Sequence, residues 1–263
     1  MRKLFFILIV FLILSAGWIF WRTYTVYRSF TNEKSLQPPP SPTEPTSDTK
    51  TKSVSFGTNT YAYDFISVST PSAISVIPNF SEKKESRSLM EGNSCTDAIN
   101  GGFYTKSDSP LGLFRINNHD IGPEIESRLV DGFFWADDQG RIAISSQLPE
   151  QSVRFAIQIG PMLISKGDTI LLSINKDTHA RRMIVAQTTD GLIIFASVYN
   201  AESVFDGPKL SDVPAILERI SKKENLTISE AINLDGGSAS AYYHGDTSLS
   251  ELTFIGSLFC IKQ

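Results

Sequence analysis

The chain has 263 residues and a formal net charge of −4 at pH 7. This length can hold one large domain or two small ones, and the slightly acidic balance argues against a nucleic-acid-binding surface. The first fifth of the chain has the composition of a membrane segment and a linker. We therefore expect one domain of about 200 residues, which is enough to bury a full core.

An almost uninterrupted apolar run extends from Leu4 to Trp21, preceded by two basic residues. A hydrocarbon core needs about 20 apolar residues, so this run predicts a membrane helix. The small residues Ser15, Ala16 and Gly17 leave a cleaved signal peptide as the alternative. The bulky apolar residues that follow them favour an uncleaved signal anchor within residues 1–30. Both interpretations place the rest of the chain on the extracytoplasmic side, anchored to the membrane or secreted.

Residues 31–53 are rich in Pro, Ser and Thr and include the run Pro38-Pro39-Pro40-Ser41-Pro42. Such a segment cannot bury enough apolar surface to offset its ordering entropy, and its prolines favour an extended spacer. It predicts a disordered linker, followed by a single domain over residues 54–263.

Short alternating or aliphatic runs separated by turn residues follow in the predicted domain, and they are typical of β-strands. Predicted strands lie at residues 61–68, 73–77, 113–116, 133–136, 141–144, 155–164, 183–187, 192–196 and 231–235. One helix is expected from Ser211 to about Lys222, with Ser211 as its N-cap and Pro214 in the tolerated first turn. Its predicted buried stripe is Val213, Ile216, Leu217 and Ile220. The fold class is therefore α+β, strand-rich with few helices.

The two cysteines, Cys95 and Cys260, lie far apart in the sequence. In an extracytoplasmic domain they can pair and clip the last strand to the body, or they can be two separate buried thiols. Geometry decides between these alternatives.

The chain is organised around residues 231–243, where an apolar run ends in Asp235, Gly236, Gly237 and Ser238 and a second run of strand formers follows. This pattern predicts strand, tight turn, strand. The glycines allow main-chain N–H groups to approach a ligand closely, with Asp235 and Ser238 beside them. The alternative is a glycine hairpin with a solvated aspartate.

Three further motifs precede this turn: Asn100-Gly101-Gly102-Phe103-Tyr104, Gln158-Ile159-Gly160-Pro161-Met162-Leu163-Ile164 and Arg181-Arg182-Met183-Ile184-Val185. Together and in this order, the four motifs resemble those of the phosphodiester glycosidase family. The resemblance covers roughly residue 55 to the C-terminus. Counted back from Asp190-Gly191, Arg182 falls on the arginine that opens a strand in the family pattern. In the family pattern a small residue often follows this arginine, whereas Met183 follows it here. The resemblance therefore predicts the guanidinium but not the shape of the pocket.

The resemblance implies cleavage of a sugar-1-phosphate diester at the anomeric carbon. Because the transition state of such a reaction resembles an oxocarbenium ion, a carboxylate near the anomeric carbon can stabilise positive charge or activate water. Asp235 is the candidate for this role. Arg182 is the candidate that holds the phosphate oxygens. The second carboxylate of a usual glycosidase pair is not identified, and Asp97, Asp120 and Asp190 are all open.

The remaining motif residues are expected to orient the carbohydrate phosphodiester. This substrate-binding set comprises Asn100, Gly101, Gly102, Phe103, Gln158, Gly160, Gly236, Gly237 and Ser238. Asparagine and glutamine amides can both donate and accept hydrogen bonds, which suits sugar hydroxyls and phosphate oxygens. For Asn100 alone, capping of the turn is the other interpretation.

Other catalytic chemistries find no support in the sequence. Ser238 and Ser240 lie in no nucleophile-elbow pattern, the three histidines are scattered, and no zinc-binding spacing is present. No cofactor is predicted, although a divalent cation stays open. The competing function is a non-catalytic, membrane-tethered glycan-binding module on the same fold, and a purely structural envelope protein is a third alternative.

Overall fold

The computed structural model describes residues 51–262. The predicted anchor, nearly all of the predicted linker and residue 263 lie outside the described residues. Within residues 51–262, no helix is long and apolar enough to cross a membrane.

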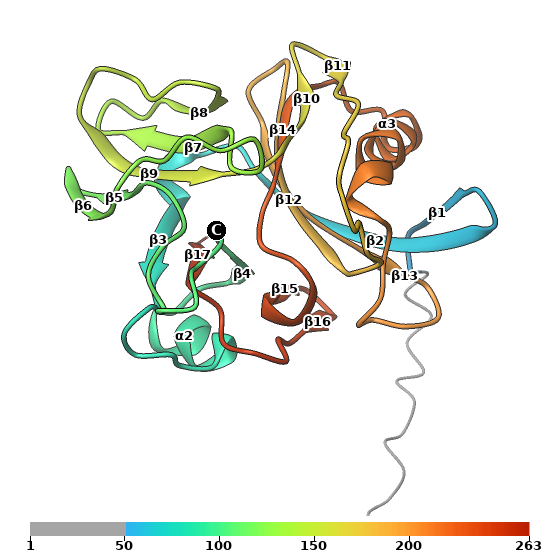
Figure 1. The fold of residues 1–263 in the computed structure, drawn as a ribbon, viewed down its shortest axis with the longest axis horizontal. Helices are drawn as coiled ribbons and strands as arrows, with labels where there is room; N and C mark the ends of the chain where they lie inside the picture. Colours follow the sequence, from blue (N-terminus) through green and yellow to red (C-terminus); the bar gives the residue numbers. More distant parts are fainter. Residues whose placement is uncertain (1–50, 263) are drawn as a thin grey trace, which may run out of the picture. The chain divides into compact units, whose positions relative to one another are not determined.

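The described part of the chain folds into three antiparallel sheets, which surround a common centre in Figure 1. The seven-stranded sheet has the order β1 (Ser53–Phe56), β2 (Asn59–Val68), β13 (Ile193–Asn200), β12 (Arg182–Thr188), β14 (Ile228–Asn233), β10 (Met162–Ser165) and β11 (Asp168–Thr169). The second sheet, called here the β4 sheet, has the order β16 (Thr247–Leu249), β15 (Tyr242–His244), β4 (Asp97–Asn100), β17 (Ser257–Ile261) and β3 (Ile74–Pro78). The third, the β9 sheet, has the order β6 (His119–Gly122), β5 (Phe114–Ile116), β9 (Val153–Ile159), β7 (Gly132–Asp137) and β8 (Ile142–Ser145).

The main core lies between the sheets and is centred on phenylalanine rings from all three. Phe134 of the β9 sheet packs against Phe195 of the seven-stranded sheet and Phe259 of the β4 sheet, with ring centroids 5.7 and 5.4 Å away. All three side chains are fully buried. Aromatic pairs at this spacing stabilise a core beyond the area they bury.

The outer face of the seven-stranded sheet is covered by α3 (Val213–Glu224), which lies at the right in Figure 1. The predicted stripe of Val213, Ile216, Leu217 and Ile220 is buried there, and Pro214 lies in the first turn. Strand β12 is consequently buried on both faces: Met183 and Val185 belong to the main core, whereas Ile184 and Ala186 contact the α3 side. A strand-rich single domain with few helices is therefore confirmed.

The predicted N-cap of this helix was wrong. Ser211 lies in a 3₁₀ turn, η2 (Leu210–Asp212), that precedes α3, and the N-cap is Asp212, whose side chain makes no cap hydrogen bond. The carboxylate of Asp177, from a distant loop, instead accepts the N–H groups of Leu210 and Ser211 at 2.9 and 2.8 Å. A long-range carboxylate thus replaces the local hydroxyl cap that the sequence indicated.

Two predicted elements are divided between sheets. The predicted strand over residues 155–164, in which Gly160 and Pro161 indicate a break or bend, is two strands, because the chain leaves the β9 sheet after β9 and enters the seven-stranded sheet at β10. Likewise β14 and β15 do not form a hairpin: β14 pairs with β12 and β10, whereas β15 pairs with β4 and β16. The glycine turn between them therefore carries the chain from one sheet to another.

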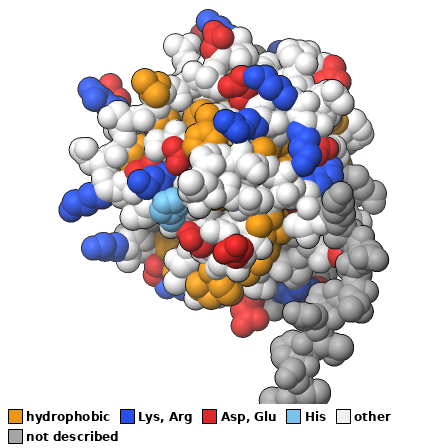
Figure 2. All heavy atoms as spheres, turned by 90° about the vertical axis from the view of Figure 1, so that its right-hand side faces the viewer, with side chains coloured by type: hydrophobic (Ala, Val, Ile, Leu, Met, Phe, Trp, Pro, Cys, Tyr) orange, Lys and Arg blue, Asp and Glu red, His pale blue; other side chains and the backbone are white. Residues whose placement is uncertain are grey.

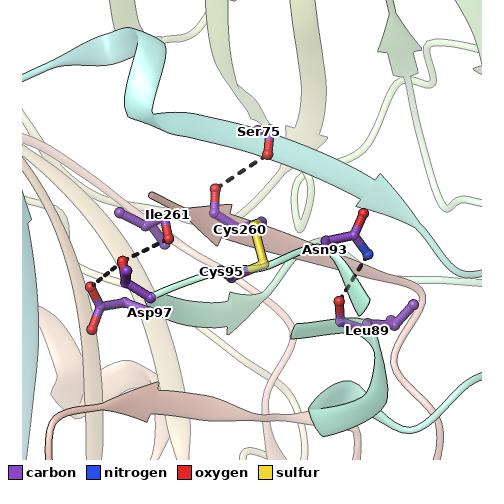
Figure 3. Close-up of a disulfide and its surroundings, with 8 residues drawn as sticks. Ser75, Leu89, Asn93, Cys95, Asp97, Cys260 and Ile261 are labelled. Atoms are coloured by element: carbon purple, nitrogen blue, oxygen red, sulfur yellow. Dashed lines mark hydrogen bonds between the residues drawn. A yellow bond between two sulfur atoms is a disulfide. The ribbon is translucent and has the colours of Figure 1, made fainter. Parts of the chain in front are cut away.

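The two cysteines form a disulfide that joins the chain just before β4 to the last strand, β17 (Figure 3). The Cα atoms are 5.3 Å apart and the residues are separated by 165 positions in the sequence. In the same region, the N–H and hydroxyl of Thr96 donate to the carbonyl of Ile261 at 2.9 and 3.0 Å. The short helix α2 (Ser86–Gly92) lies next to this junction.

Candidate active site

Main-chain hydrogen bonds bring all four sequence motifs together around the end of β14. The N–H of Asp235 donates to the carbonyl of Gly101 at 3.1 Å, and the N–H of Gly237 donates to that of Arg181 at 2.9 Å. The side-chain amide of Asn233 donates to the carbonyl of Gly160 at 3.1 Å. At three of these segments, those of Gly101, Gly160 and Asp235, the chain passes from one sheet to another. These three crossings therefore lie close together. Segments that are far apart in the sequence thereby become neighbours.

Asp235 lies two positions after the end of β14 and has a half-buried carboxyl group. Its Oδ1 accepts the N–H of Gly236 at 2.9 Å. Burial raises the pKa of the Asp235 carboxyl to about 7, although the Gly236 hydrogen bond acts in the opposite direction. A carboxyl group with a pKa near neutrality exists in both protonation states at physiological pH, which is the property that general acid–base catalysis requires.

The side chain of Asn100 holds the Asp235 turn in place through hydrogen bonds. Its side chain is 1% exposed, and its amide nitrogen donates to the carbonyls of Asp235 at 2.8 Å and Gly101 at 3.1 Å. Its amide oxygen accepts the N–H of Ala241 at 2.9 Å. Both amide hydrogens are used within the protein, so in this structure Asn100 positions Asp235 and joins the two glycine motifs.

Gln158 has a similar bracing geometry in the β9 sheet. Its buried amide oxygen accepts the N–H groups of Leu113 and Ile125, each at 3.0 Å. Its nitrogen donates to the carbonyls of Ile125 and Val130 at 2.7 and 2.9 Å. The Gln158 side chain therefore attaches residues 113–130 to β9. This attachment lies close to Gly160, where the chain leaves the β9 sheet.

The predicted glycines lie at the close approaches of the site. A Cβ on Gly101 would lie 2.2 Å from the hydroxyl oxygen of Ser257, so a larger residue there requires at least this hydroxyl to move. Gly237 has a φ of +63°, a backbone conformation that glycine adopts readily, and it begins the single 3₁₀ turn η3 (Gly237–Ala239). Gly102 is buried against Ile157 and Ile159 of β9, and a Cβ on Gly236 would meet the carbonyl of Arg181.

The two remaining predicted residues lie nearer the surface. Ser238 is exposed, and its carbonyl accepts the N–H groups of Leu252 and Thr253 at 2.7 and 3.0 Å. Phe103 is half-buried, and its carbonyl accepts the N–H of Leu111 at 2.9 Å. Both are therefore on the solvent side of the glycine turns.

The adjacent arginines have different surroundings. Arg182 donates from Nε to the carbonyl of Pro208 at 2.9 Å and from Nη2 to that of Thr178 at 2.5 Å, and Nη2 is 3.6 Å from Asp177. Its Nη1 has no hydrogen-bond partner among the described residues. Neither arginine donates to the Asp235 carboxylate within residues 51–262. The Arg182 guanidinium is thus held within the protein through Nε and Nη2.

Arg181 is the residue that sequence reasoning missed. It is 1% exposed and donates to the hydroxyl and carbonyl of Ser240 at 2.9 and 2.5 Å and to the carbonyl of Ser250 at 2.8 Å. Within the described chain it forms no salt bridge, and burial lowers the pKa of its guanidinium. It therefore holds the 237–240 turn from inside. No local signal separates two consecutive arginines at the start of a strand that is buried on both faces.

The candidates for a second carboxylate lie in other surroundings. Asp97 contacts the imidazole of His244 at 2.7 Å, Asp120 pairs with Arg115, and Asp190 accepts the hydroxyl of Thr188. None of these three is hydrogen-bonded to the Asp235 turn. Asp131, which the sequence analysis did not consider, lies beside the Gly160 crossing, and burial raises the pKa of its carboxyl group. It becomes a fourth candidate.

A metal centre has no obvious ligand set in this part of the chain. Among residues 51–262, no group of three or more His, Cys, Asp or Glu side chains is placed to hold a metal ion. A divalent cation held by fewer side chains and by substrate oxygens stays untested.

Comparison of the sequence with models of protein families identifies the family of this chain. The model of the phosphodiester glycosidase family matches residues 93–255, which is more than half of the chain. The chain belongs to this family. No curated protein sequence matches it.

Solved structures show the same fold at low sequence identity. The zebrafish catalytic domain of N-acetylglucosamine-1-phosphodiester alpha-N-acetylglucosaminidase, auto-inhibited by its pro-peptide, is 15% identical, with a TM-score of 0.60 over 81% of each chain. A hypothetical protein from Synechocystis is 14% identical, with a TM-score of 0.62 over 81% of this chain and 61% of its own. These similarities establish the fold and not the substrate.

Proposed function

We propose that this domain hydrolyses a sugar-1-phosphate diester at the anomeric carbon. The observation that carries the proposal is Asp235: a half-buried carboxyl group with a pKa of about 7, in a turn at which all four family motifs meet. Water attacks the anomeric carbon, the bond from that carbon to the phosphate oxygen breaks, and the products are a free sugar and a phosphomonoester. Ionised Asp235 accepts the proton of the water and stabilises the positive charge on the sugar ring.

Arg182 is proposed to hold the departing phosphate through its free Nη1. A phosphate is already a weak base, so its departure needs less protonation than that of an ordinary alcohol. A guanidinium that contacts the phosphate oxygens therefore supplies much of the remaining stabilisation. Asn100, Gln158 and Arg181 would act as positioning residues behind the site, because their polar groups are used within the protein.

We further propose that the domain acts on a surface glycan or glycoconjugate outside the cytoplasm. The disulfide between Cys95 and Cys260 supports this proposal, because such bonds persist mainly in oxidising compartments. The apolar run from Leu4 to Trp21 would attach the domain to a membrane.

The test is release of reducing sugar from a panel of sugar-1-phosphodiesters by the full chain in mild detergent. N-acetylglucosamine-1-phosphate diesters come first, because the zebrafish relative is named for them. Asp235→Asn and Arg182→Gln should each lower kcat/KM by about a hundredfold or more. The control variant Asp168→Asn, at the exposed start of β11, should leave kcat/KM unchanged.

Turnover of either variant within threefold of the parent would remove that residue from the mechanism. No turnover by the parent, combined with glycan binding that Asp235→Asn leaves undiminished, would support the glycan-binding module in place of an enzyme.

A further inference from the structure

A cavity of about 450 Å³ lies on the far side of the segment that contacts Ser238. Residues 83–87, which lead into α2, form one wall, and residues 250–254, between β16 and β17, form the other. Figure 1 shows this connection passing beside α2. Tyr243 also lines the cavity. The volume is within the range of small-molecule sites and holds a sugar unit with its substituent.

Cationic and aromatic side chains meet in this cavity, which we call the α2 cavity. The guanidinium of Arg87 lies over the ring of Tyr243 at 4.9 Å, and the ammonium of Lys83 is 5.2 Å from the ring centroid of Phe254. Lys84 is the third cation in the lining. Guanidinium and ammonium groups bind phosphate and carboxylate oxygens, and ring faces suit the apolar side of a sugar.

Two acidic residues, Glu85 and Glu251, also line the cavity, and Glu251 is already hydrogen-bonded within the protein. Glu251 accepts the N–H of Ser86 at 2.6 Å and also the hydroxyl of Ser86. In contrast, Arg87 has no carboxylate partner within the described chain, and its guanidinium donates to the hydroxyl of Ser248 at 2.7 Å. Lys84 pairs with Glu82 and Lys83 pairs with Asp108, both at the surface, so either ion pair costs little to exchange for a ligand anion.

A buried cation lies behind the same wall. Arg181 donates to the carbonyl of Ser250, a residue that lines the cavity, and forms no salt bridge in the described chain. Its charge is little screened by solvent because its side chain is 1% exposed. Arg181 therefore adds a positive charge behind the wall, which the nearby carboxylate of Glu251 partly offsets.

The wall between the cavity and the candidate active site is a single segment. Leu252 and Thr253 line the cavity, and their N–H groups donate to the carbonyl of Ser238 at 2.7 and 3.0 Å. Only Gly236 and Gly237 lie between Asp235 and Ser238 in the sequence. A glycan bound in the cavity thus has only this segment to pass before it reaches the Asp235 turn.

We propose that the α2 cavity binds an anionic unit of a glycan next to the phosphodiester that is cleaved. This inference rests on the proposed function of the Asp235 turn and narrows its substrate class to polyanionic glycans with repeated sugar phosphates. A small isolated diester would occupy the turn alone and leave the cavity empty.

The kinetic test compares two substrates of the same sugar: a phosphodiester-linked trimer and a monomeric sugar-1-phosphate methyl diester. The variant is Lys84→Gln with Arg87→Gln, in the full chain, and its matched control is Lys166→Gln with Lys222→Gln on distant surfaces. We expect kcat/KM for the trimer to fall at least ten times more than kcat/KM for the monomer, in the variant only. Equal falls for both substrates would overturn the proposal.

A binding test separates this proposal from the proposed reaction. Its probe is a trimer of the same sugar joined by non-hydrolysable phosphonates, titrated calorimetrically into the full chain, with a neutral trimer as comparison. We expect the phosphonate trimer to bind at least tenfold more weakly to the Lys84→Gln, Arg87→Gln variant than to its control. Absent binding, or binding that the variant leaves unchanged, would refute the anionic cavity. Charge-dependent binding without turnover of any substrate would refute hydrolysis and leave the cavity standing.

Discussion

The protonation state of Asp235 is expected to affect both the proposed reaction and the stability of the domain. If its ionised form is the active one, kcat/KM should rise with pH to a plateau, with a midpoint near the pKa of about 7. The measurement is a pH profile of kcat/KM on a cleaved diester. A profile that is flat between pH 5.5 and 8.5 would contradict this role for the carboxylate.

The same pKa predicts that Asp235 lowers stability at neutral pH. The folded-state pKa of about 7 is above the ordinary value of 3.8, so the folded protein binds more protons than the unfolded chain between these values. Its free energy of unfolding therefore falls as pH rises from about 4 to about 7 and changes no further through this group. The contribution is less than a full conversion of the shift would give, because the carboxyl group is partly exposed.

Replacement by a neutral amide removes this penalty. We expect Asp235→Asn to raise the free energy of unfolding by about 1–2 kcal/mol at pH 8 and to have little effect near pH 4. Urea unfolding at both pH values measures it, with Asp168→Asn as the control. Equal stability of parent and variant at pH 8 would show that the carboxyl group is not desolvated.

At the scale of elements, the start of α3 depends on a residue far from the helix. Burial alone would raise the pKa of Asp177, but the N–H groups of Ser211 and Leu210 outweigh it and leave the pKa below its ordinary value. Asp177→Ala should therefore lower the free energy of unfolding by about 1–2 kcal/mol at pH 7, as the loss of a helix cap does.

The direction of that pH dependence differs from that of Asp235. Because the folded-state pKa of Asp177 is depressed, its contribution is present above the unfolded pKa and disappears as pH falls through the folded one. The decrease in the free energy of unfolding that Asp177→Ala causes should thus be smaller at acidic pH. Thermal unfolding of parent and variant at pH 7 and pH 3 measures this difference. Asp212→Asn serves as the matched control, since the side chain of Asp212 makes no cap hydrogen bond at the start of α3. A larger effect of Asp212→Asn would restore the local cap.

At the scale of the whole domain, the disulfide closes a loop of 165 residues between Cys95 and Cys260. Cross-links over long loops restrict the unfolded chain most, and loss of a native disulfide costs about 2–5 kcal/mol. Cys95→Ser with Cys260→Ser should lower stability by this amount. A reducing agent should lower the unfolding midpoint of the parent and leave that of the double variant unchanged. A parent insensitive to reduction would mean that the bridge contributes nothing to stability.

The surface of the domain mixes its charges on the face shown in Figure 2, where Lys and Arg side chains alternate with Asp and Glu around small apolar areas. This view is of the side that carries α3 and β2 in Figure 1. The α2 cavity concentrates three basic side chains and a buried arginine in one place. Long-range attraction of an anionic glycan would thus depend on local charge rather than on the net charge of −4.

The sequence by itself determined what depends on neighbours along the chain. Alternating and aliphatic runs located most strands of the described chain, the stripe from Val213 to Ile220 located α3, and the glycine pairs located the turns, because each of these is a local backbone or periodicity signal. The order of four motifs also indicated the family that the comparison confirmed.

Only the tertiary structure decided which segments meet. Alternation carries no information about partner strands, so the division of residues 155–164 between two sheets was not predictable from it. Similarly, Arg181 and Arg182 are chemically identical in the sequence and differ only in what surrounds each guanidinium. The tertiary structure likewise decided the cap by Asp177, the disulfide between the two cysteines and the pKa of Asp235. Each is set by burial and by contacts between residues distant in sequence, which exist only after the sheets have packed together.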